Sequence, residues 1–381
     1  MPIYLDHNAT TPLDPRVLQA MLPWLEGTHG NPSSVHQFGR AAHAAIETAR
    51  RQVAALVNAE TAQVIFTGGG TEADNLALKG VCRGKPGSLL VSAIEHAAVQ
   101  GPADALAKLG WQVQHIVVDA HGCLRLDALD RALGDEVRLV SVMFANNETG
   151  AIQPVADVAA RAHARGALVH CDAIQAPGRV PLDFAALGVD LLSLSAHKLN
   201  GPRGVGALIV SRHLQLAPLV EGGGQEHGLR GGTENLAGIV GFGCAAALAR
   251  EEQPARAVQL RALRDRFESG LHAFPDIRVF AADAERLPNT SQIGVEGFDG
   301  EAVVMELDRR GIAVSSGSAC HSASGRPSHV LLAMGLDEAT ARSAVRVSFG
   351  RENTEADVDA ILAALRQILK SWREHARAVA W

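Results

Sequence analysis

The sequence predicts an α/β protein in which a large domain, with a mainly parallel sheet flanked by helices, is joined to a small α+β domain. Short apolar runs alternate with helix-like segments over most of the chain, as expected for parallel strands joined by crossover helices. Polar residues follow the ends of these runs, where open α/β sheets bind ligands. We expect a segment 1–15 that packs with the small domain, a large domain 16–250 and a small domain 251–381.

Composition excludes several classes of protein. The chain has 381 residues, of which 47% are hydrophobic and 20% are charged, which is typical of a globular protein. The net charge is -6 and no basic cluster is present, so we expect no direct contact with nucleic acid. No apolar run reaches about 18 residues, so no membrane span is expected. Five cysteines without framework spacing, and no signal peptide, favour reduced thiols and a cytoplasmic location.

The first third of the chain is predicted to contain two helices and a glycine-rich turn. Helices are expected over 17–25 and 39–57, and the loops around them resemble plain connections. An apolar strand then runs into three glycines at 68–70, and Thr71 and Asp74 form a capping pattern for the next helix. Such a turn can cradle a phosphate or be an ordinary connection, and the local sequence favours neither.

Polar residues follow the predicted strands of the large domain. Strands are expected over 88–92, 111–118, 137–143, 167–172 and 191–194, with helices over 97–109 and 153–165. Because parallel strands end at one edge, the following residues are expected to gather there: His96, Asn147, Asp172, Gln175, Ser195, His197 and Lys198.

Lys198 is expected at the end of a buried strand. Taken alone, a lysine there is more simply explained as part of a surface turn. A buried amine is costly, however, and condensation with the aldehyde of pyridoxal 5′-phosphate (PLP) removes its charge. That cofactor also needs an acid at its ring nitrogen, a flat neighbour and a phosphate cradle. Asp172, His96 and residues 68–71 supply these parts in a plausible order.

The small domain is predicted to carry two reactive features. After a helix over 241–273, we expect strands over 277–280, 290–295, 312–315 and 343–349 and helices over 300–310, 328–334 and 354–373. Residues 315–327 are rich in serine and glycine and are expected to form a mobile loop around Cys320, where a thiol can become a nucleophile. Arg346 lies within an apolar strand and needs an anion, either a substrate carboxylate or a structural partner.

Almost the whole chain resembles cysteine desulfurases of the NifS/IscS kind, in the class V aminotransferase family of fold-type I PLP enzymes. The motifs that carry the resemblance are YLDHNATTP at 4–12, GNPSS at 30–34, ANNETG at 145–150, DAIQ at 172–175, SAHK at 195–198, RGGT at 230–233 and SSGSACHS at 315–322.

The resemblance implies a role for each matching residue. Lys198 would bind the cofactor aldehyde, Asp172 the pyridine nitrogen, and His96 would stack on the ring. Phosphate contacts would come from Gly70, Thr71, Ser195, His197 and, across a homodimer, Thr233 of the other subunit. Asn147 and Gln175 would contact ring substituents, and Arg346, with Asn147, the substrate. No resident metal site is implied.

The implied reaction converts L-cysteine to L-alanine and leaves a persulfide on Cys320, with Lys198 as the base and His96 as a further catalytic residue. A sulfur-acceptor protein, for example an iron–sulfur scaffold, would take the sulfur onward. His321 and Gly325-Arg326 depart from the usual pattern beside Cys320. A histidine beside the nucleophile could lower the pKa of the Cys320 thiol or alter the choice of acceptor. The resemblance also leads us to expect that the longer C-terminal tail of some relatives is missing. The C-terminal difference bears on the partner rather than the reaction.

Two other classes of function remain open at this stage. A different PLP enzyme, such as a selenocysteine lyase or an aminotransferase, would share Lys198 and Asp172 but would not need Cys320. A non-catalytic nucleotide-binding protein would explain the glycine turn but neither Lys198 nor Arg346.

Overall fold

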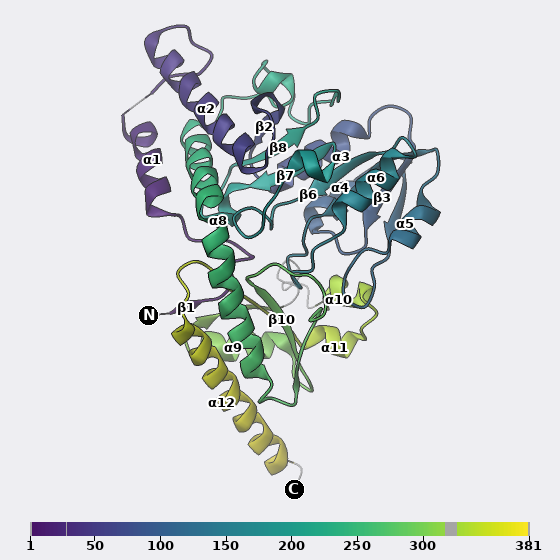
Figure 1. Cartoon of the computed structure of the whole chain (residues 1–381), viewed down its shortest axis with the longest axis vertical. Coiled ribbons are helices and arrows are strands. Elements are labelled where there is room, and N and C mark those ends of the chain that lie inside the picture. Colours follow the sequence, from purple (N-terminus) through teal and green to yellow (C-terminus); the bar gives the residue numbers. More distant parts are fainter. Residues whose placement is uncertain (1, 28, 317–325, 380–381) are drawn as a thin grey trace.

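A seven-stranded sheet forms the larger part of the molecule (Figure 1). The computed structural model describes residues 2–27, 29–316 and 326–379, and side chains as far as residue 374. The strands, in spatial order, are β2 (Val64–Thr67), β8 (Gly206–Val210), β7 (Leu191–Ser195), β6 (Leu168–Asp172), β5 (Val137–Met143), β3 (Ser88–Ser92) and β4 (Gln112–Ile116). From β7 to β4 all neighbours are parallel, whereas β8 is antiparallel to both β7 and β2. The prediction of a mainly parallel sheet is therefore confirmed.

Helices cover both faces of this sheet. They are α1 (Pro15–Glu26), α2 (Gln37–Leu56), α3 (Gly70–Val81), α4 (Ala97–Lys108), α5 (Leu126–Ala132), α6 (Val155–His163), α7 (Phe184–Leu187) and α8 (Leu236–Leu271). Because successive strand residues point to opposite faces, Leu90 packs in a core with α2, α6 and α8, while Leu89 and Val91 pack with α3 and α4. Both faces of the inner strands are thus buried, which explains why apolar residues predominate in them.

The smaller part is built on a four-stranded antiparallel sheet. Its order is β12 (Ser315–Ser316), β13 (Ala344–Ser348), β10 (Thr290–Val295) and β9 (Ile277–Val279). Its helices are α9 (Gly300–Asp308), α10 (His329–Ala333), α11 (Glu338–Arg342) and α12 (Glu355–Val379). Near the N-terminus, β1 (Ile3–Tyr4) pairs with β11 (Ile312–Ala313), and Leu5 is buried in the core of this part.

One long helix, α8, connects the two parts (Figure 1). It continues without a break through residue 250, where the sequence suggests a division. The core that it joins nevertheless changes there, because Ala249 packs with the large sheet and Leu260 with the small one. The predicted division therefore falls within a rigid element, and we retain 1–15, 16–250 and 251–381 as a proposed organisation.

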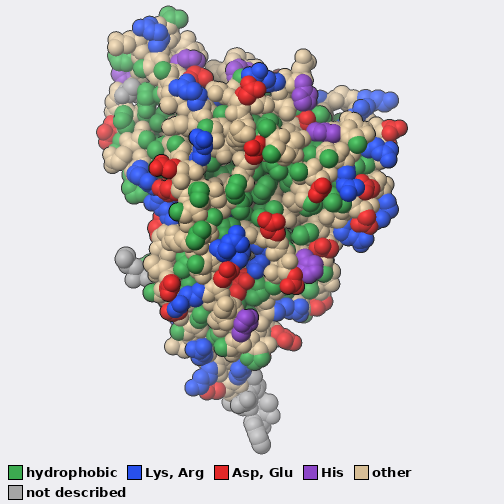
Figure 2. Space-filling view, viewed as in Figure 1, with side chains coloured by type: hydrophobic (Ala, Val, Ile, Leu, Met, Phe, Trp, Pro, Cys, Tyr) green, Lys and Arg blue, Asp and Glu red, His purple; other side chains and the backbone are tan. Residues whose placement is uncertain are grey.

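The surface carries no concentration of one charge on the face that Figure 2 displays, where acidic and basic side chains are interspersed. Among the described residues, no helix is both long enough and apolar enough to cross a membrane. Within the same part of the chain, no group of three or more histidine, cysteine and acidic side chains could hold a metal ion.

Candidate active site

A cavity of about 350 Å³ lies where β5, β6 and β7 end. Met143, Asp172 and Ser195, the last residues of these three parallel strands, all line it. Ten of the predicted site residues surround the cavity: Gly70, Thr71, His96, Asn147, Asp172, Gln175, Ser195, His197, Lys198 and Arg346. The fold therefore brings together residues that are far apart in the sequence, of which Gly70 and Arg346 are separated by 276 positions.

Lys198 reaches this cavity from the short 3-10 helix Ala196–Lys198 that follows β7. Its Nζ donates to the backbone carbonyl oxygens of Asn8, at 2.5 Å, and Ala9, at 2.8 Å. These contacts hold the amine at the cavity wall next to the N-terminal segment. A plain surface turn, the simpler explanation for this lysine, is thereby excluded.

Asp172 is buried at the end of β6, and its Oδ1 accepts a hydrogen bond from Ile174 N at 3.0 Å. Burial, reinforced by the negative charge of Asp74, raises the pKa of Asp172 to about 7. A carboxyl group in this position favours a cationic partner, because such a partner offsets the cost of burying its charge. A protonated pyridine nitrogen is a partner of this kind.

A second buried acid, Asp74, lies behind Asp172. Burial raises its pKa to about 7, and its Oδ1 is 3.5 Å from His170 Nε2. His170 also lies 2.8 Å from Ser141 Oγ and 2.9 Å from Ser193 Oγ, and burial lowers its pKa to about 4. His170 is therefore neutral at pH 7, and this polar layer supplies no full positive charge to Asp172.

The helix α3 begins at Gly70, and the expected cap by Thr71 and Asp74 is wrong. The residue before the helix is Gly69, with φ 155°, and no side chain caps the helix. Thr71 lies one position inside the first turn, and Asp74 is buried. The N–H groups of the first turn therefore remain available to an anion, as a phosphate cradle requires.

Close packing around Gly70 shapes this cradle. A Cβ at Gly70 would lie 2.3 Å from Ile174 Cδ1 and 3.3 Å from Ser195 Cβ, so the helix start and the end of β7 approach each other closely. An adjoining hollow of about 640 Å³ shares Gly70, Thr71, Ser195 and His197 with the first cavity.

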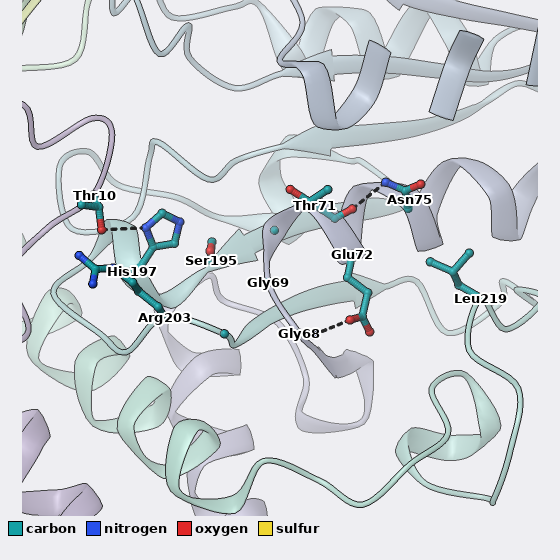
Figure 3. Close-up of a pocket in the computed structure, with 12 residues that line it drawn as sticks. Thr10, Gly68, Gly69, Thr71, Glu72, Asn75, Ser195, His197, Arg203 and Leu219 are labelled. Carbon is teal, nitrogen blue, oxygen red and sulfur yellow. Dashed lines mark hydrogen bonds between the residues drawn. The ribbon is translucent and has the colours of Figure 1, made fainter. Parts of the chain in front are cut away.

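Figure 3 shows this hollow with the glycine turn on one side and Ser195, His197 and Arg203 on the other. His197 Nδ1 lies 3.1 Å from Thr10 Oγ1. Burial and the charges of Lys198 and Arg203 lower the pKa of His197 to about 4, so its ring is neutral at pH 7.

His96 is held by the start of α4. Its Nδ1 accepts a hydrogen bond from Ala98 N at 3.1 Å, so the proton of the neutral ring lies on Nε2. The ring lines the cavity. This contact fixes a flat side chain at the wall, which is the property that stacking on a planar cofactor needs.

Arg346 has an anionic partner in the protein, namely Asp6. Its Nη2 lies 2.6 Å from Asp6 Oδ1, and its Nη1 donates to the backbone oxygen of Asn147 at 3.1 Å. Its Nε is buried without a hydrogen-bond partner in the described part of the chain. Both explanations of Arg346 therefore have support, because Arg346 forms a structural ion pair and also lines the cavity.

Of the two remaining predicted residues, one lies elsewhere and the other is not described. Thr233 is exposed and lines a separate hollow with Gly232 and Glu234, so it does not reach the cavity of its own chain. Cys320 lies within 317–325, outside the described residues, as does His321.

Sequence reasoning missed the N-terminal segment as part of the site. Asn8 and Ala9 accept from Lys198, and Asn8 Nδ2 donates to Asn147 O at 3.0 Å and to Thr290 Oγ1 at 2.9 Å. The local pattern of residues 6–12 suggests only a turn. The signal that identifies them is the motif at 4–12 taken as a whole.

A family model described as Aminotransferase class-V matches residues 3–361. The chain belongs to this family. A cysteine desulfurase of Gluconacetobacter diazotrophicus is 47% identical over 98% of this chain and 94% of the relative. Among solved structures, a NifS-like protein has a TM-score of 0.92 at 36% identity, covering 97% of this chain and all (100%) of the other. A second, titled SspA in complex with cysteine, has a TM-score of 0.82 at 35% identity, covering 91% and 98%.

As a class V aminotransferase, the chain is a fold-type I enzyme that uses PLP. The residues present fit this cofactor. The buried carboxyl of Asp172, the amine of Lys198 and the uncapped start of α3 lie around one cavity. A non-catalytic nucleotide-binding role is therefore excluded.

Proposed function

We propose that this chain is a PLP-dependent cysteine desulfurase that converts L-cysteine to L-alanine and retains the sulfur as a persulfide on Cys320. The observation that carries the proposal is the placement of Lys198, Asp172 and Arg346 around one cavity, in a chain that is 47% identical to a cysteine desulfurase.

The cofactor would be held at four points: its ring nitrogen, its ring face, its ring substituents and its phosphate. Asp172 would hold the pyridine nitrogen, His96 would cover the ring, and Asn147 and Gln175 would contact its substituents. Gly70, Thr71, Ser195 and His197 would hold the phosphate. When bound, PLP supplies an electron sink for the bond changes at the substrate Cα.

Lys198 is the proposed carrier of the proton at the substrate Cα. Its Nζ needs freedom to leave the cofactor and move that proton. The carbonyl oxygens of Asn8 and Ala9 provide acceptors that keep the amine within the cavity during this movement.

Arg346 is the proposed anchor for the substrate carboxylate. Its side chain is 2% exposed, and its Nε has no hydrogen-bond partner within the described residues. A carboxylate that approaches from the cavity would share the guanidinium with Asp6 and form charge-assisted hydrogen bonds.

Cys320 is the proposed sulfur acceptor. Its thiolate would attack the substrate sulfur, the bond from that sulfur to Cβ would break, and protonation of the carbon would give L-alanine. The four described cysteines are less suited, because burial raises the pKa of Cys82 to about 12 and also raises the pKa of Cys123, Cys171 and Cys244.

We further propose a homodimer in which Thr233 contacts the phosphate bound by the other subunit. Thr233 is not among the residues that line the cavity of its own chain. The loop that carries it is fixed by Glu226, which accepts from Arg50 Nη1 at 2.7 Å and from Phe66 N at 2.8 Å. Large apolar side chains on and near α1 and α2 are exposed, including Val35 (87%) and Leu25 (61%), which favours coverage by a second copy.

An acceptor protein, for example an iron–sulfur scaffold, would receive the sulfur. We also propose a cytoplasmic location, because free thiols persist in a reducing compartment and the four described cysteines are free.

The function is tested by assaying L-alanine and sulfide from L-cysteine with the wild type and with Lys198→Ala. We expect the variant to lose turnover and the visible absorption of the bound cofactor. Lys108→Ala, a change at an exposed lysine, should retain both. Normal turnover by Lys198→Ala would refute the cofactor assignment, and transamination without sulfide would indicate a different PLP enzyme.

A further inference from the structure

Arg179 is 5% exposed and contacts Gln175, and it is not among the residues that line the cavity. Its Nη1 donates to the backbone oxygen of Gln175 at 2.8 Å and also to the side-chain Oε1 of Gln175. Its Nη2 donates to His7 O at 3.2 Å. The buried guanidinium of Arg179 therefore forms hydrogen bonds both to Gln175, which lines the cavity, and to the N-terminal segment at His7.

Within the described residues, the charge of Arg179 has no carboxylate partner. Two neighbouring arginines form ion pairs, Arg346 with Asp6 and Arg256 with Glu252. In the part of the chain that the structure describes, no acidic side chain lies within ion-pair distance of Arg179. Burial, together with the like charges of Arg256 and Arg346, lowers its pKa to about 9, so it remains charged at pH 7. An uncompensated buried cation is costly, which favours an anion in the neighbourhood.

The grip of Arg179 also fixes the orientation of the Gln175 amide. Because Oε1 is bound to Arg179, the NH₂ group must point the other way. One of its hydrogens is donated to Asn8 O at 3.0 Å. The second N–H is then left for the cavity that Gln175 lines. Gln175 thus offers a donor, and not an acceptor, to whatever occupies the cavity.

We propose that Arg179 is a positioning residue, which holds Gln175 as a hydrogen-bond donor to the ring oxygen of PLP and stabilises negative charge on that oxygen. This inference rests on the cofactor placement proposed above. Asp172 would then stabilise the positive charge on the pyridine nitrogen, and the Arg179–Gln175 pair would stabilise the negative charge on the ring oxygen. The other ionisable groups lining the cavity are His96, His197, Lys198 and Arg346.

A purely structural role for Arg179 makes a different prediction. In that case its bonds to His7 and Gln175 only tie two backbone segments together. Substitution would lower the stability of the protein but would leave the electronic state of a correctly bound cofactor unchanged. The two roles are therefore separated by the spectrum of the cofactor, and not by activity.

The experiment is a pH titration of the visible absorption band of the PLP-loaded protein without substrate, for the wild type, Arg179→Met, Gln175→Ala and the double variant. Loss of the cation and of the donor should each make the bound cofactor release its proton at higher pH. We expect Arg179→Met to raise the midpoint by about one unit. The double variant should match the larger single shift, because both residues act through one hydrogen bond.

Arg256→Met is the matched control. It removes a neighbouring arginine whose partner is Glu252, and it should leave the midpoint close to that of the wild type. An unchanged midpoint in folded Arg179→Met, or additive shifts in the double variant, would overturn the inference.

If Arg179→Met does not fold, Arg179→Lys is used in its place. Lysine keeps the positive charge but lacks the planar guanidinium that donates to Gln175. An upward shift that disappears in the Gln175→Ala background supports the inference, and equal shifts in both backgrounds overturn it. The proposed function is judged separately, by L-alanine formation in the wild type. A desulfurase with unshifted titrations would refute only the role of Arg179.

Discussion

Asp172 occupies a position where a negative charge is costly until a cation is bound. Its pKa is raised to about 7 by burial and by Asp74. The folded, cofactor-free protein therefore binds a proton on this residue more tightly than the unfolded chain does, whose pKa lies near 3.8. The free energy of unfolding contributed by Asp172 falls as pH rises from about 4 to about 7, and is constant above that.

Asp172→Asn should remove this pH-dependent cost. Without cofactor, the variant should gain stability over the wild type between about pH 4 and 7, reaching on the order of 4 kcal/mol above pH 7. It should also bind PLP more weakly, because the amide carries no charge for the pyridine nitrogen. Denaturant unfolding of both cofactor-free proteins at pH 5 and pH 8 measures the first effect. A stability difference that does not change with pH would contradict this account of Asp172.

Arg346→Ala should raise the KM for L-cysteine while the visible band of the cofactor persists. A buried charge-assisted contact to the substrate carboxylate contributes about 1.5–3 kcal/mol, or roughly ten- to a hundredfold in binding. The control is Arg278→Ala, which changes an exposed arginine of the small sheet. If KM were unchanged in Arg346→Ala, the ion pair with Asp6 would be the whole role of this residue.

At the scale of single residues, the sequence identified those that follow strand ends. His96, Asp172 and Lys198 could be placed because parallel strands share one edge. Asn8 and Arg179 could not be placed in this way. Asn8 acts through a contact with Gln175, more than 160 residues away, and Arg179 acts through a hydrogen bond to the side chain of Gln175. Local patterns carry no information about such contacts.

Among the elements, the start of α3 determines how an anion can be held. Gly70→Ala would place a methyl group 2.3 Å from Ile174 Cδ1, so the helix start must move away from Ser195. We expect weaker PLP binding, seen as a higher dissociation constant in reconstitution, by at least about tenfold, equivalent to the loss of about 1.4 kcal/mol.

Gly101→Ala is the control for Gly70→Ala. Gly101 also lies in a helix, but a Cβ there would meet no atom within 4 Å. This change should leave PLP binding intact and stabilise α4 slightly. Equal PLP affinity in the two variants would show that close packing at Gly70 does not shape the cradle.

Element types were more predictable than element ends. The strands predicted over 137–143 and 290–295 coincide with β5 and β10, and each strand ends at an apolar residue that is buried, Met143 and Val295. The strand predicted over 111–118 is shorter, Gln112–Ile116, and several of its residues are exposed at the sheet edge. The capping pattern at Thr71 failed because a glycine before it already began the helix.

At the scale of the whole molecule, the proposed homodimer makes each cavity depend on two chains. Mixed dimers of a Lys198→Ala chain and a Thr233→Val chain provide the test. If Thr233 acts across the interface, one cavity of the mixed dimer combines an intact Lys198 with an intact Thr233 and regains wild-type turnover. If Thr233 serves its own chain, both cavities stay impaired and activity does not exceed that of Thr233→Val alone.

The packing of the two parts could be predicted only in outline. The change from one hydrophobic core to the other occurs within α8, which has no break that composition could reveal. The N-terminal strand β1 joins the small part through pairing with β11, more than 300 residues away. Such long-range pairing depends on the completed fold.

The central claim is that sulfur passes from L-cysteine to Cys320. The most direct measurement is mass spectrometry of the PLP-loaded protein after a single turnover with L-cysteine, with L-alanine measured in the same sample. We expect one L-alanine per added sulfur atom, with the sulfur on the peptide that contains Cys320. Cys320→Ala should transfer no sulfur, although its visible spectrum should still change when it binds cysteine. Sulfur on Cys82 or Cys123, or normal sulfide release by Cys320→Ala, would contradict it.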